Sequence, residues 1–245
     1  MTTPAAPPIV DRDTWRREQH DLRLTEKAYT RQGDAIAATR RRLPMTEVDA
    51  SAELVGHAGR TTLLDAFAGR DQLIAYKHMW HPGRPIEQQC EGCTFTIWNF
   101  QDACYLHARG VSFAVFCEGR WDEVAPFRDF MGYTLPWYSV SGVDDPAVAA
   151  GISDDDRGLI ACYLRIGDRV FLTSETTRRG VETIMPSLRL LDLTAYGRQE
   201  VWEDSPAGWP QGPTYAIWSR DGRPTAQWTR PGATRVHGAA EHSCH

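Results

Sequence analysis

Two stretches of the chain determine its fold: QLIAY at residues 72–76 and QCEGC at residues 89–93. The first is a short apolar run, typical of a strand that is buried on both faces. A helical pattern then runs from near Cys90 to Ala108, before a second buried-type strand, VSFAVF, at residues 111–116. The order strand, helix, strand predicts two parallel strands with Cys90 and Cys93 at the start of the helix between them.

Cys90 and Cys93 have the spacing of a redox-active pair. Two thiols three residues apart at a helix start can close a small disulfide ring, and the first sulfur faces unpaired N–H groups at the positive end of the helix dipole. Such an environment lowers the pKa of a thiol from about 8.5 toward about 7. Glu91 opposes this effect, because a neighbouring carboxylate disfavours the thiolate. A cytosolic CxxC in this context is typical of a thioredoxin-like redox motif, and we expect a moderately reducing couple.

The rest of the chain alternates between helix and strand before it becomes irregular. Helices are predicted at 11–42, 62–67, 122–131 and 181–193. Strands are predicted at 48–55, 137–140, 159–165 and 169–173, and an acidic loop at 144–157. After Gly197 the residues are rich in Pro, Gly and Trp, with one more hairpin candidate at 215–218 and 226–228, around Asp221-Gly222. We predict an α/β fold on a mixed sheet, in which the parallel part comes first and an antiparallel edge follows.

The helix predicted at 11–42 carries a single apolar line. Its apolar residues recur every seven positions, at Trp15, Leu22, Tyr29, Ile36 and Leu43. The companion heptad positions are polar, so half of a coiled-coil seam is missing. We expect this helix to lay one narrow stripe across its own domain or across a partner subunit, and a homodimer through this helix is the candidate assembly.

The composition excludes several classes of function. The 245 residues include 27 basic and 32 acidic side chains, a net charge of −5, which argues against a general nucleic-acid binder. No apolar run approaches the roughly 18 residues that span a bilayer, and residues 1–13 do not have the pattern of a secretory signal. We therefore expect a cytoplasmic protein without a membrane partner. Six cysteines in a chain of this length do not form a disulfide scaffold, and the motifs of kinases, dinucleotide enzymes and serine hydrolases are absent.

Other reactive side chains follow the ends of the two buried strands. The segment after residues 72–76 contains His78 and His81. Sites in α/β sheets form beyond the carboxyl ends of parallel strands, so we expect both histidines to share one pocket with Cys90 and Cys93. The expected lining of this substrate pocket is Trp80, Cys117 and Trp137.

This set of side chains allows two kinds of chemistry. In the first, Cys90 and Cys93 carry out thiol chemistry, His78 or His81 donates or accepts a proton, and no cofactor is required. In the second, the same four residues bind copper, or less favourably zinc, because thiolate and imidazole together select these metals. The His-Ser-Cys-His tail at residues 242–245 is a further candidate ligand set.

From Thr61 onward the chain resembles the bacterial "domain of unknown function 899" family, which is grouped with thioredoxin-like proteins. The resemblance rests on blocks of sequence: LDAF at 64–67 with GR at 69–70 and QLIAY at 72–76, His78 followed by CEGC at 90–93, MGYTLPW at 131–137, and LDLT at 191–194 with GRQE at 197–200. The N-terminal helix ahead of these blocks also fits, so the resemblance covers roughly residues 10–200.

The resemblance implies a thioredoxin fold in which Cys90 is the attacking thiol and Cys93 the resolving thiol. We predict an N-terminal helical extension at 1–44, a thioredoxin-like domain at 45–196 with flanking helices on a mixed sheet, and an irregular C-terminal extension at 197–245. The predicted function is that of an oxidoreductase that exchanges thiols and disulfides or acts on a small molecule. The alternatives are a copper carrier or copper-dependent oxidase of the same fold, and an interaction protein without redox chemistry.

Overall fold

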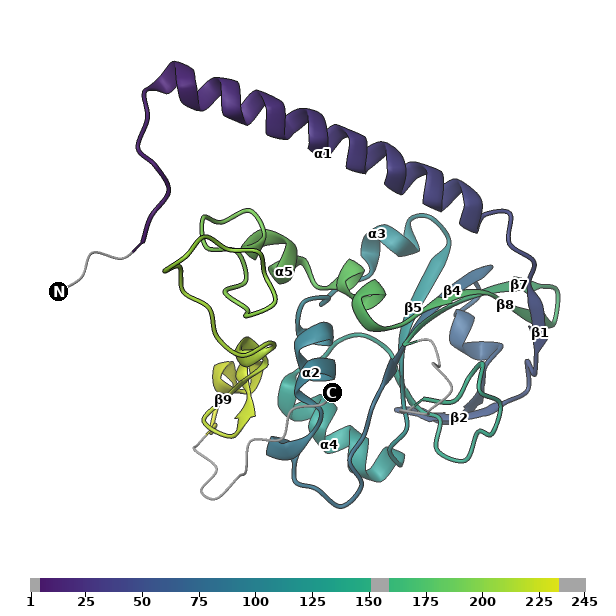
Figure 1. The fold of residues 1–245 in the computed structure, drawn as a ribbon. Coiled ribbons are helices and arrows are strands. Elements are labelled where there is room, and N and C mark those ends of the chain that lie inside the picture. Colours follow the sequence, from purple (N-terminus) through teal and green to yellow (C-terminus); the bar gives the residue numbers. More distant parts are fainter. Residues whose placement is uncertain (1–4, 151–158, 234–245) are drawn as a thin grey trace.

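The computed structural model describes residues 5–150 and 159–233 (Figure 1). Eight strands of this part of the chain form one mixed sheet in the order β1-β8-β7-β4-β5-β6-β2-β3. Their bounds are β1 Thr46–Val48, β2 Glu53–Gly56, β3 Gly59–Thr62, β4 Gln72–His78, β5 Val111–Cys117, β6 Trp137–Ser139, β7 Ile160–Ile166 and β8 Arg169–Thr176. The parallel pairs are β4 with β5 and β5 with β6, and every other neighbouring pair is antiparallel.

Five α-helices and five short 3-10 helices accompany this sheet in the described residues. The α-helices are α1 Arg12–Arg40, α2 Glu91–Trp98, α3 Cys104–His107, α4 Trp121–Met131 and α5 Pro186–Leu191. Short 3-10 helices lie at η1 Asp65–Phe67, η2 Ile86–Gln88, η3 Arg178–Ile184, η4 Ala216–Trp218 and η5 Thr225–Thr229. A separate two-stranded hairpin consists of β9 Ser219–Arg220 and β10 Arg223–Pro224. In the described residues, no helix is long and apolar enough to cross a membrane.

The central elements confirm the predicted thioredoxin-like fold class. β4, α2 and β5 form a parallel unit, α4 follows β5, and the antiparallel hairpin β7–β8 joins the other edge of β4. The resulting strand order β8-β7-β4-β5, with α2 beginning beyond the carboxyl end of β4, is that of a thioredoxin-like core. The N-terminal helix and the irregular C-terminal segment are present as predicted.

Apolar cores lie on both faces of the central strands. Leu73 of β4 and Phe116 of β5 belong to one core, whereas Tyr76 and Val115 belong to the other, which also contains side chains of α2 and α4. Successive side chains of a strand point to opposite faces, so a strand buried on both sides needs a continuous apolar run. This requirement explains why QLIAY and VSFAVF identify the two central strands.

The helix predicted from Cys90 to Ala108 is in fact two helices, α2 and α3, separated by residues 99–103. Asn99 ends α2, because its side-chain amide donates a hydrogen bond to the carbonyl oxygen of Phe95 at 2.8 Å. The side-chain oxygen of Asn99 accepts the backbone N–H of Ser187 at 3.1 Å. The asparagine therefore joins the end of α2 to α5, a contact that no local pattern reveals.

The helix predicted at 181–193 is also divided, into η3 and α5. Pro186 is the first residue of α5. A proline has no N–H for the helical ladder and its ring clashes with the preceding turn, so it begins a helix but does not continue one.

The C-terminal hairpin has the predicted turn but not the predicted strands. Asp221 and Gly222 lie in the left-handed region at φ 52° and 80°, as a tight hairpin turn requires. The strands are only two residues long each, and residues 216–218 and 225–229 form 3-10 helices instead of the predicted strands. Elsewhere, the pattern at 48–55 divides into β1 and β2, the helix at 62–67 shortens to η1, and part of the loop predicted at 144–157 lies outside the described residues.

The long helix α1 buries no residue against the rest of the described chain. Figure 1 shows it as a long rod that runs along one side of the molecule. Asp11 caps its first turn by accepting the backbone N–H groups of Asp13 and Thr14, each at 2.9 Å. Four residues of the predicted heptad line lie in α1 and are exposed, Trp15, Leu22, Tyr29 and Ile36, and the fifth, Leu43, follows the helix and is exposed as well. The stripe is therefore not laid across the helix's own domain.

Candidate functional site

Cys90 lies at the N-cap position of α2, as the sequence predicts. Its Sγ accepts the backbone N–H of Cys93 at 3.4 Å, and its carbonyl oxygen accepts the backbone N–H of Thr94 at 3.0 Å. The sulfur therefore occupies the place of a capping side chain at the positive end of the helix. A thiolate at this position is stabilised by the same N–H group and by the helix dipole.

Gln89 fixes the loop that carries the chain from β4 to Cys90. Its side-chain oxygen accepts the backbone N–H of His81 at 3.0 Å, and its side-chain nitrogen donates to the carbonyl oxygens of His81 and Arg84 at 3.1 and 3.0 Å. The Gln89 side chain is buried, so these bonds are shielded from water. One buried amide thus holds a segment that has little regular secondary structure of its own.

Cys93 lies one helical turn deeper and faces the end of β4. Its Sγ accepts the backbone N–H of Met79 at 3.4 Å. The Tyr76 phenol lies beside both thiols, and its pKa is raised by burial and by the charge of Cys93 and Cys90. The two cysteines and Tyr76 are each only 1% exposed. The dithiol is therefore enclosed rather than presented at the surface.

His78 and Cys117 lie opposite each other at the carboxyl ends of β4 and β5. Their Cα atoms are register partners, and Nδ1 of His78 is 4.0 Å from the Cys117 sulfur. The same Nδ1 is 2.6 Å from the carbonyl oxygen of Met79, which can only accept a hydrogen bond. This contact assigns the proton to Nδ1 and leaves Nε2 with a lone pair. Nε2 is buried and has no hydrogen-bond partner among the described residues.

Burial sets the charge of this pair at neutral pH. It lowers the pKa of His78 to about 4, against a smaller opposing effect of the hydrogen bond to Met79. It also raises the pKa of the Cys117 thiol to about 12. The imidazole and this thiol are therefore both neutral near pH 7. A buried, protonated Cys117 is not a nucleophile.

The shifted pKa of His78 makes the folding stability depend on pH. Because the folded state binds this proton less tightly than the unfolded chain, the contribution of His78 is complete above pH 6.5 and is lost as the pH falls toward 4. We expect the free energy of unfolding to decrease by about 3 kcal/mol across that window. Urea titrations at several pH values measure this slope. The His78→Leu variant should flatten it, and an unchanged slope in that variant would contradict the assignment.

Aromatic rings enclose His78. The imidazole centroid lies 5.0 Å from that of Trp137 and 5.7 Å from that of Phe127. Trp80 packs edge-on against Phe127, and its indole N–H donates to Glu123 at 2.9 Å. The indole N–H of Trp137 is buried and, in the described part of the chain, has no acceptor. Trp80, Trp137 and Cys117 thus share one buried core with the dithiol.

The structure places the two histidines differently. His78 is fully buried at the end of β4, whereas His81 is partly exposed in the following loop, where its backbone is held by Gln89. In the described residues, no group of three or more His, Cys, Asp or Glu side chains is arranged to hold a metal ion. The tail at 242–245 lies outside the described residues.

Sequence reasoning missed the segment that covers the dithiol. Trp218 packs against Gly92, between the two cysteines, although it lies more than 120 residues away in the chain. Arg223 and Gln227 are buried nearby, at 2% and 0% exposed. The high tryptophan content was the available signal, but composition does not reveal which tryptophan meets which helix.

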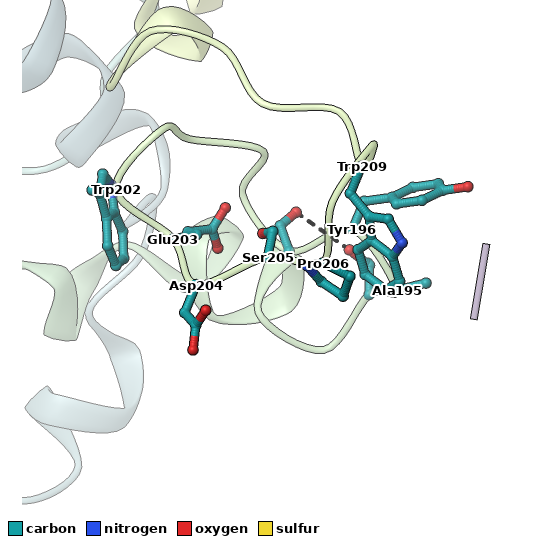
Figure 2. Close-up of a pocket in the computed structure, with 10 residues that line it drawn as sticks. Ala195, Tyr196, Trp202, Glu203, Asp204, Ser205, Pro206 and Trp209 are labelled. Atoms are coloured by element: carbon teal, nitrogen blue, oxygen red, sulfur yellow. Dashed lines mark hydrogen bonds between the residues drawn. The ribbon is translucent and has the colours of Figure 1, made fainter. Parts of the chain in front are cut away.

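A surface hollow lies away from the dithiol, in the C-terminal extension. It has a volume of about 340 Å³, and Figure 2 shows its lining. Tyr196 and Trp209 pack edge-on at one end, with ring centroids 5.3 Å apart, and the Tyr196 hydroxyl donates to the carbonyl oxygen of Ala5 at 2.8 Å. None of the predicted site residues lines this hollow.

Three solved structures are similar to parts of this chain. One is a DsbF homologue from Corynebacterium diphtheriae, at 13% identity, covering 59% of this chain and 86% of its own, with a TM-score of 0.32. Another is a yeast mitochondrial 1-Cys peroxiredoxin, at 11% identity, covering 61% and 75%, with a TM-score of 0.33. The third is a secreted Mycobacterium tuberculosis disulfide oxidoreductase homologous to E. coli DsbE, at 11% identity, covering 58% and 100%, with a TM-score of 0.32.

These superpositions are too weak to assign a function, and the fold class rests on the strand order described above. No curated protein matches the chain. A family model does match residues 4–223, which include α1, the whole of the described sheet and most of the segment that covers the dithiol. The chain therefore belongs to the family described as bacterial proteins of unknown function, DUF899.

Proposed function

We propose that this protein is a thiol-based oxidoreductase in which Cys90 and Cys93 cycle between a dithiol and a disulfide. The observation that carries the proposal is the position of the Cys90 sulfur, which caps α2 and accepts the N–H of Cys93. This arrangement stabilises a thiolate and keeps a second thiol one turn away. Both are requirements of a dithiol couple.

The proposed reaction is a two-step exchange. The Cys90 thiolate attacks one sulfur of a substrate disulfide, forms a mixed disulfide and releases the other substrate sulfur as a thiolate, which takes up a proton. The Cys93 thiolate then attacks the Cys90 sulfur, closes the protein disulfide and releases the second substrate thiol. The substrate gains two electrons and two protons, and the protein loses them. An external thiol restores the dithiol by the reverse steps.

The surroundings of Cys90 support a moderately reducing couple. Burial raises the pKa of Glu91, and a hydrogen bond from Ser219 partly opposes this rise. A carboxylate beside a thiol favours the protonated form, so Glu91 moderates the effect of the helix dipole. If the protein works in the cytoplasm, as the sequence suggests, a reducing pool of thiols drives the couple toward the dithiol.

We propose His78 as the proton acceptor of the site. Its imidazole is neutral above about pH 4, and Nε2 carries the free lone pair because Nδ1 donates to Met79. A neutral imidazole has no proton to donate through Nε2, and because its pKa lies well below that of a thiol it is a weak acceptor that assists the exchange only modestly. The pH profile of exchange should therefore follow the ionisation of the Cys90 thiol, without an additional step near pH 6.5.

Copper binding by Cys90, Cys93 and one or both of His78 and His81 is the alternative proposal. Thiolate and imidazole form a suitable donor set for this metal. In the described residues these side chains are not arranged as a group of three ligands, so binding would require a rearrangement of the loop after β4. Elemental analysis of untagged protein purified without chelator tests this alternative. One equivalent of copper that is lost in the Cys90→Ser/Cys93→Ser variant would support it.

A redox titration tests the proposed function directly. The protein is equilibrated in dithiothreitol buffers of different ratio, alkylated in acid-quenched denaturant and analysed by peptide mass spectrometry. We expect one two-electron transition, in which Cys90 and Cys93 lose their alkylation together while Cys104, Cys117 and Cys162 retain theirs. Independent oxidation of the two cysteines, or oxidation of other thiols first, would contradict the proposal.

A further inference from the structure

The segment from 213 to 230, which we call the C-terminal strap, crosses the helix that carries the dithiol. It consists of η4, the β9–β10 hairpin and η5. Figure 1 shows it in yellow and yellow-green beside α2. Its residues contact the first turn of α2, the preceding η2 and the end of α4. A segment far away in the sequence thus covers the redox motif.

Trp218 makes the central contact of the strap. Its six-membered ring lies so close to Gly92 that a Cβ at residue 92 would be only 2.6 Å from Cζ3 of the indole. The ring also stacks on Phe95, with centroids 6.1 Å apart, and on Tyr215, at 3.9 Å. The packing of Trp218 therefore requires glycine at residue 92, because any larger residue would displace the indole.

Polar contacts made by residues after Trp218 hold the strap against η2 and the end of α4. The Gln227 side chain donates to the carbonyl oxygen of Ile86 at 2.9 Å and accepts from Nε of Arg223 at 3.0 Å. At the end of the strap, Nε of Arg230 donates to the carbonyl oxygen of Phe130 at 3.0 Å. Lifting the whole strap would expose these groups and break buried hydrogen bonds, whereas turning one indole ring would not.

We infer that the strap makes the dithiol selective for low-molecular-weight disulfides over protein disulfides. The inference rests on the proposed function and adds the substrate class. Exchange requires a substrate sulfur to approach the sulfur of Cys90, a residue that is only 1% exposed. A rotation of Trp218 admits a small molecule beside Gly92. A disulfide flanked by two folded chains needs the strap to leave α2, so it reacts only from a rarely populated open state.

Two measurements on the full chain test this inference. The first is the rate at which iodoacetamide alkylates Cys90 in the reduced protein, which reports access without any redox step. The second is the pair of rate constants for exchange with 2-hydroxyethyl disulfide and with insulin. The variants are Trp218→Ala, which opens the cover, Trp218→Phe, which keeps an aromatic ring, and Trp209→Ala, which removes a tryptophan of the same extension far from α2. Gly92→Ala forces the indole of Trp218 away from α2 without a substitution in the strap itself.

We expect the wild type to react with 2-hydroxyethyl disulfide at least about 10²-fold faster than with insulin, because insulin reacts only from the rarely populated open state. Trp218→Ala and Gly92→Ala should each accelerate exchange with 2-hydroxyethyl disulfide and so lower the insulin-to-small-disulfide ratio by about tenfold or more, because the hydrogen bonds of Gln227 and Arg230 still hold the strap in place. Trp218→Phe and Trp209→Ala should leave the ratio near the wild-type value. Since Gly92→Ala and Trp218→Ala act on the same contact, their effects on the ratio should not multiply in the double variant.

The outcomes distinguish failure of the inferred substrate class from failure of the proposed thiol–disulfide exchange. Equal wild-type rates with both substrates, or an unchanged ratio in Trp218→Ala and in Gly92→Ala, would overturn the inference and leave the proposed function intact. If Cys90 alkylates readily in Trp218→Ala but exchanges with neither disulfide, the proposed function fails, and the inferred substrate class fails with it. A circular dichroism spectrum and an unfolding midpoint close to wild type confirm that each variant is folded.

A separate observation concerns α1, whose apolar line is exposed in the single chain. The residues of α1, 12–40, contain seven basic and five acidic side chains, a net charge of +2, while the remaining residues contain 20 basic and 27 acidic ones, a net charge of −7. A helix of 29 residues, about 44 Å long, thus combines an unburied apolar line with a charge opposite to that of the rest of the chain. We propose that the apolar line of α1 packs against the rest of a second copy of this chain, so that two copies exchange their N-terminal helices.

Sedimentation velocity of the full chain at low and high salt tests this assembly. We expect the wild type to sediment as a dimer of the 27.6 kDa chain, and the Leu22→Glu/Tyr29→Glu variant as a monomer. Leu24→Glu is the matched control, because Leu24 is equally exposed but lies about 200° around the helix from Leu22. A monomeric wild type, a dimer that survives the double change, or dissociation by Leu24→Glu alone would each overturn the proposal.

Discussion

Replacing Cys90 by serine is expected to lower the rate of thiol–disulfide exchange by at least about 10³-fold, because a serine hydroxyl does not ionise in the range where a thiol does. The introduced hydroxyl can still cap α2 by accepting the backbone N–H of Cys93, so the fold should be retained. Stopped-flow measurements with 2-hydroxyethyl disulfide give the rate, and an unfolding curve confirms the stability. The loss would then be a loss of the nucleophile and not of the structure.

Two further variants distinguish the roles around Cys90. In Cys93→Ser the first step should proceed and the second should not, so a mixed disulfide on Cys90 accumulates and is detected by intact mass. His78→Ala should only slow exchange, by no more than about tenfold, since it removes a weak proton acceptor but no sulfur. Equal losses in Cys90→Ser and His78→Ala, or an active Cys90→Ser protein, would contradict the proposed roles.

Replacing Arg198 by alanine is expected to lower the free energy of unfolding by about 3–5 kcal/mol, because the change leaves a buried carboxylate without its main partner. Arg198 donates to both carboxylate oxygens of Glu182, at 3.1 and 2.8 Å, and to Asp192 at 2.7 and 2.9 Å. The Arg198 and Glu182 side chains are 2% and 7% exposed. Because Arg198 donates to both carboxylates, its removal breaks all four of these hydrogen bonds at once.

Arg179 provides the matched control for this network. It also forms an ion pair with Glu182, at 2.8 Å, but its own side chain is 59% exposed. Exposed ion pairs contribute little, so Arg179→Ala should cost no more than about 1 kcal/mol. Urea unfolding of both variants tests the contrast. Similar losses in the two variants would show that burial of Arg198 is not the deciding factor.

The same network gives the stability a second dependence on pH. Burial by itself would raise the pKa of Glu182, but hydrogen bonds from Arg198 and Arg179 outweigh it and lower the pKa to about 2. A depressed carboxyl pKa contributes stability that is present above about pH 4.5 and is lost as the pH falls toward 2. This window lies below that of His78, so unfolding measurements above and below pH 4.5 separate the two groups. Arg198→Ala should weaken the lower window and leave the upper one unchanged.

Local sequence was sufficient for the centre of this fold. Largely apolar runs identified β4 and β5, since a strand buried on both faces has few polar positions. The spacing of Cys90 and Cys93 after the first run placed them at the start of α2, because capping depends on residues within one turn. The short interval between the strands predicted at 159–165 and 169–173 is likewise that of the β7–β8 hairpin, in which Gly167 takes the positive φ of 63° that a tight turn needs.

The sequence was less informative where a distant contact decides the local structure. Asn99 ends α2 while it binds Ser187, and the weak strand patterns at 215–218 and 226–228 become 3-10 helices against α2. In both cases the energy comes from packing between segments that are far apart in the chain. A local pattern reports propensity, and tertiary contacts override a propensity of a few tenths of a kcal/mol per residue.

The same distinction between local pattern and tertiary contact applies to the candidate site. Residue types and their spacing placed Cys90 and Cys93 at the start of α2, near the end of the strand that carries His78, but they did not distinguish His78 from His81. The neutral charge of His78 and the proton on its Nδ1 came from the folded chain, because that state depends on burial and on the Met79 carbonyl. The cover of Trp218 over Gly92 also came from the fold, because a contact across more than 120 residues leaves no periodic trace in the chain. Spacing therefore points to the candidate reactive groups, and packing determines their charge and what can reach them.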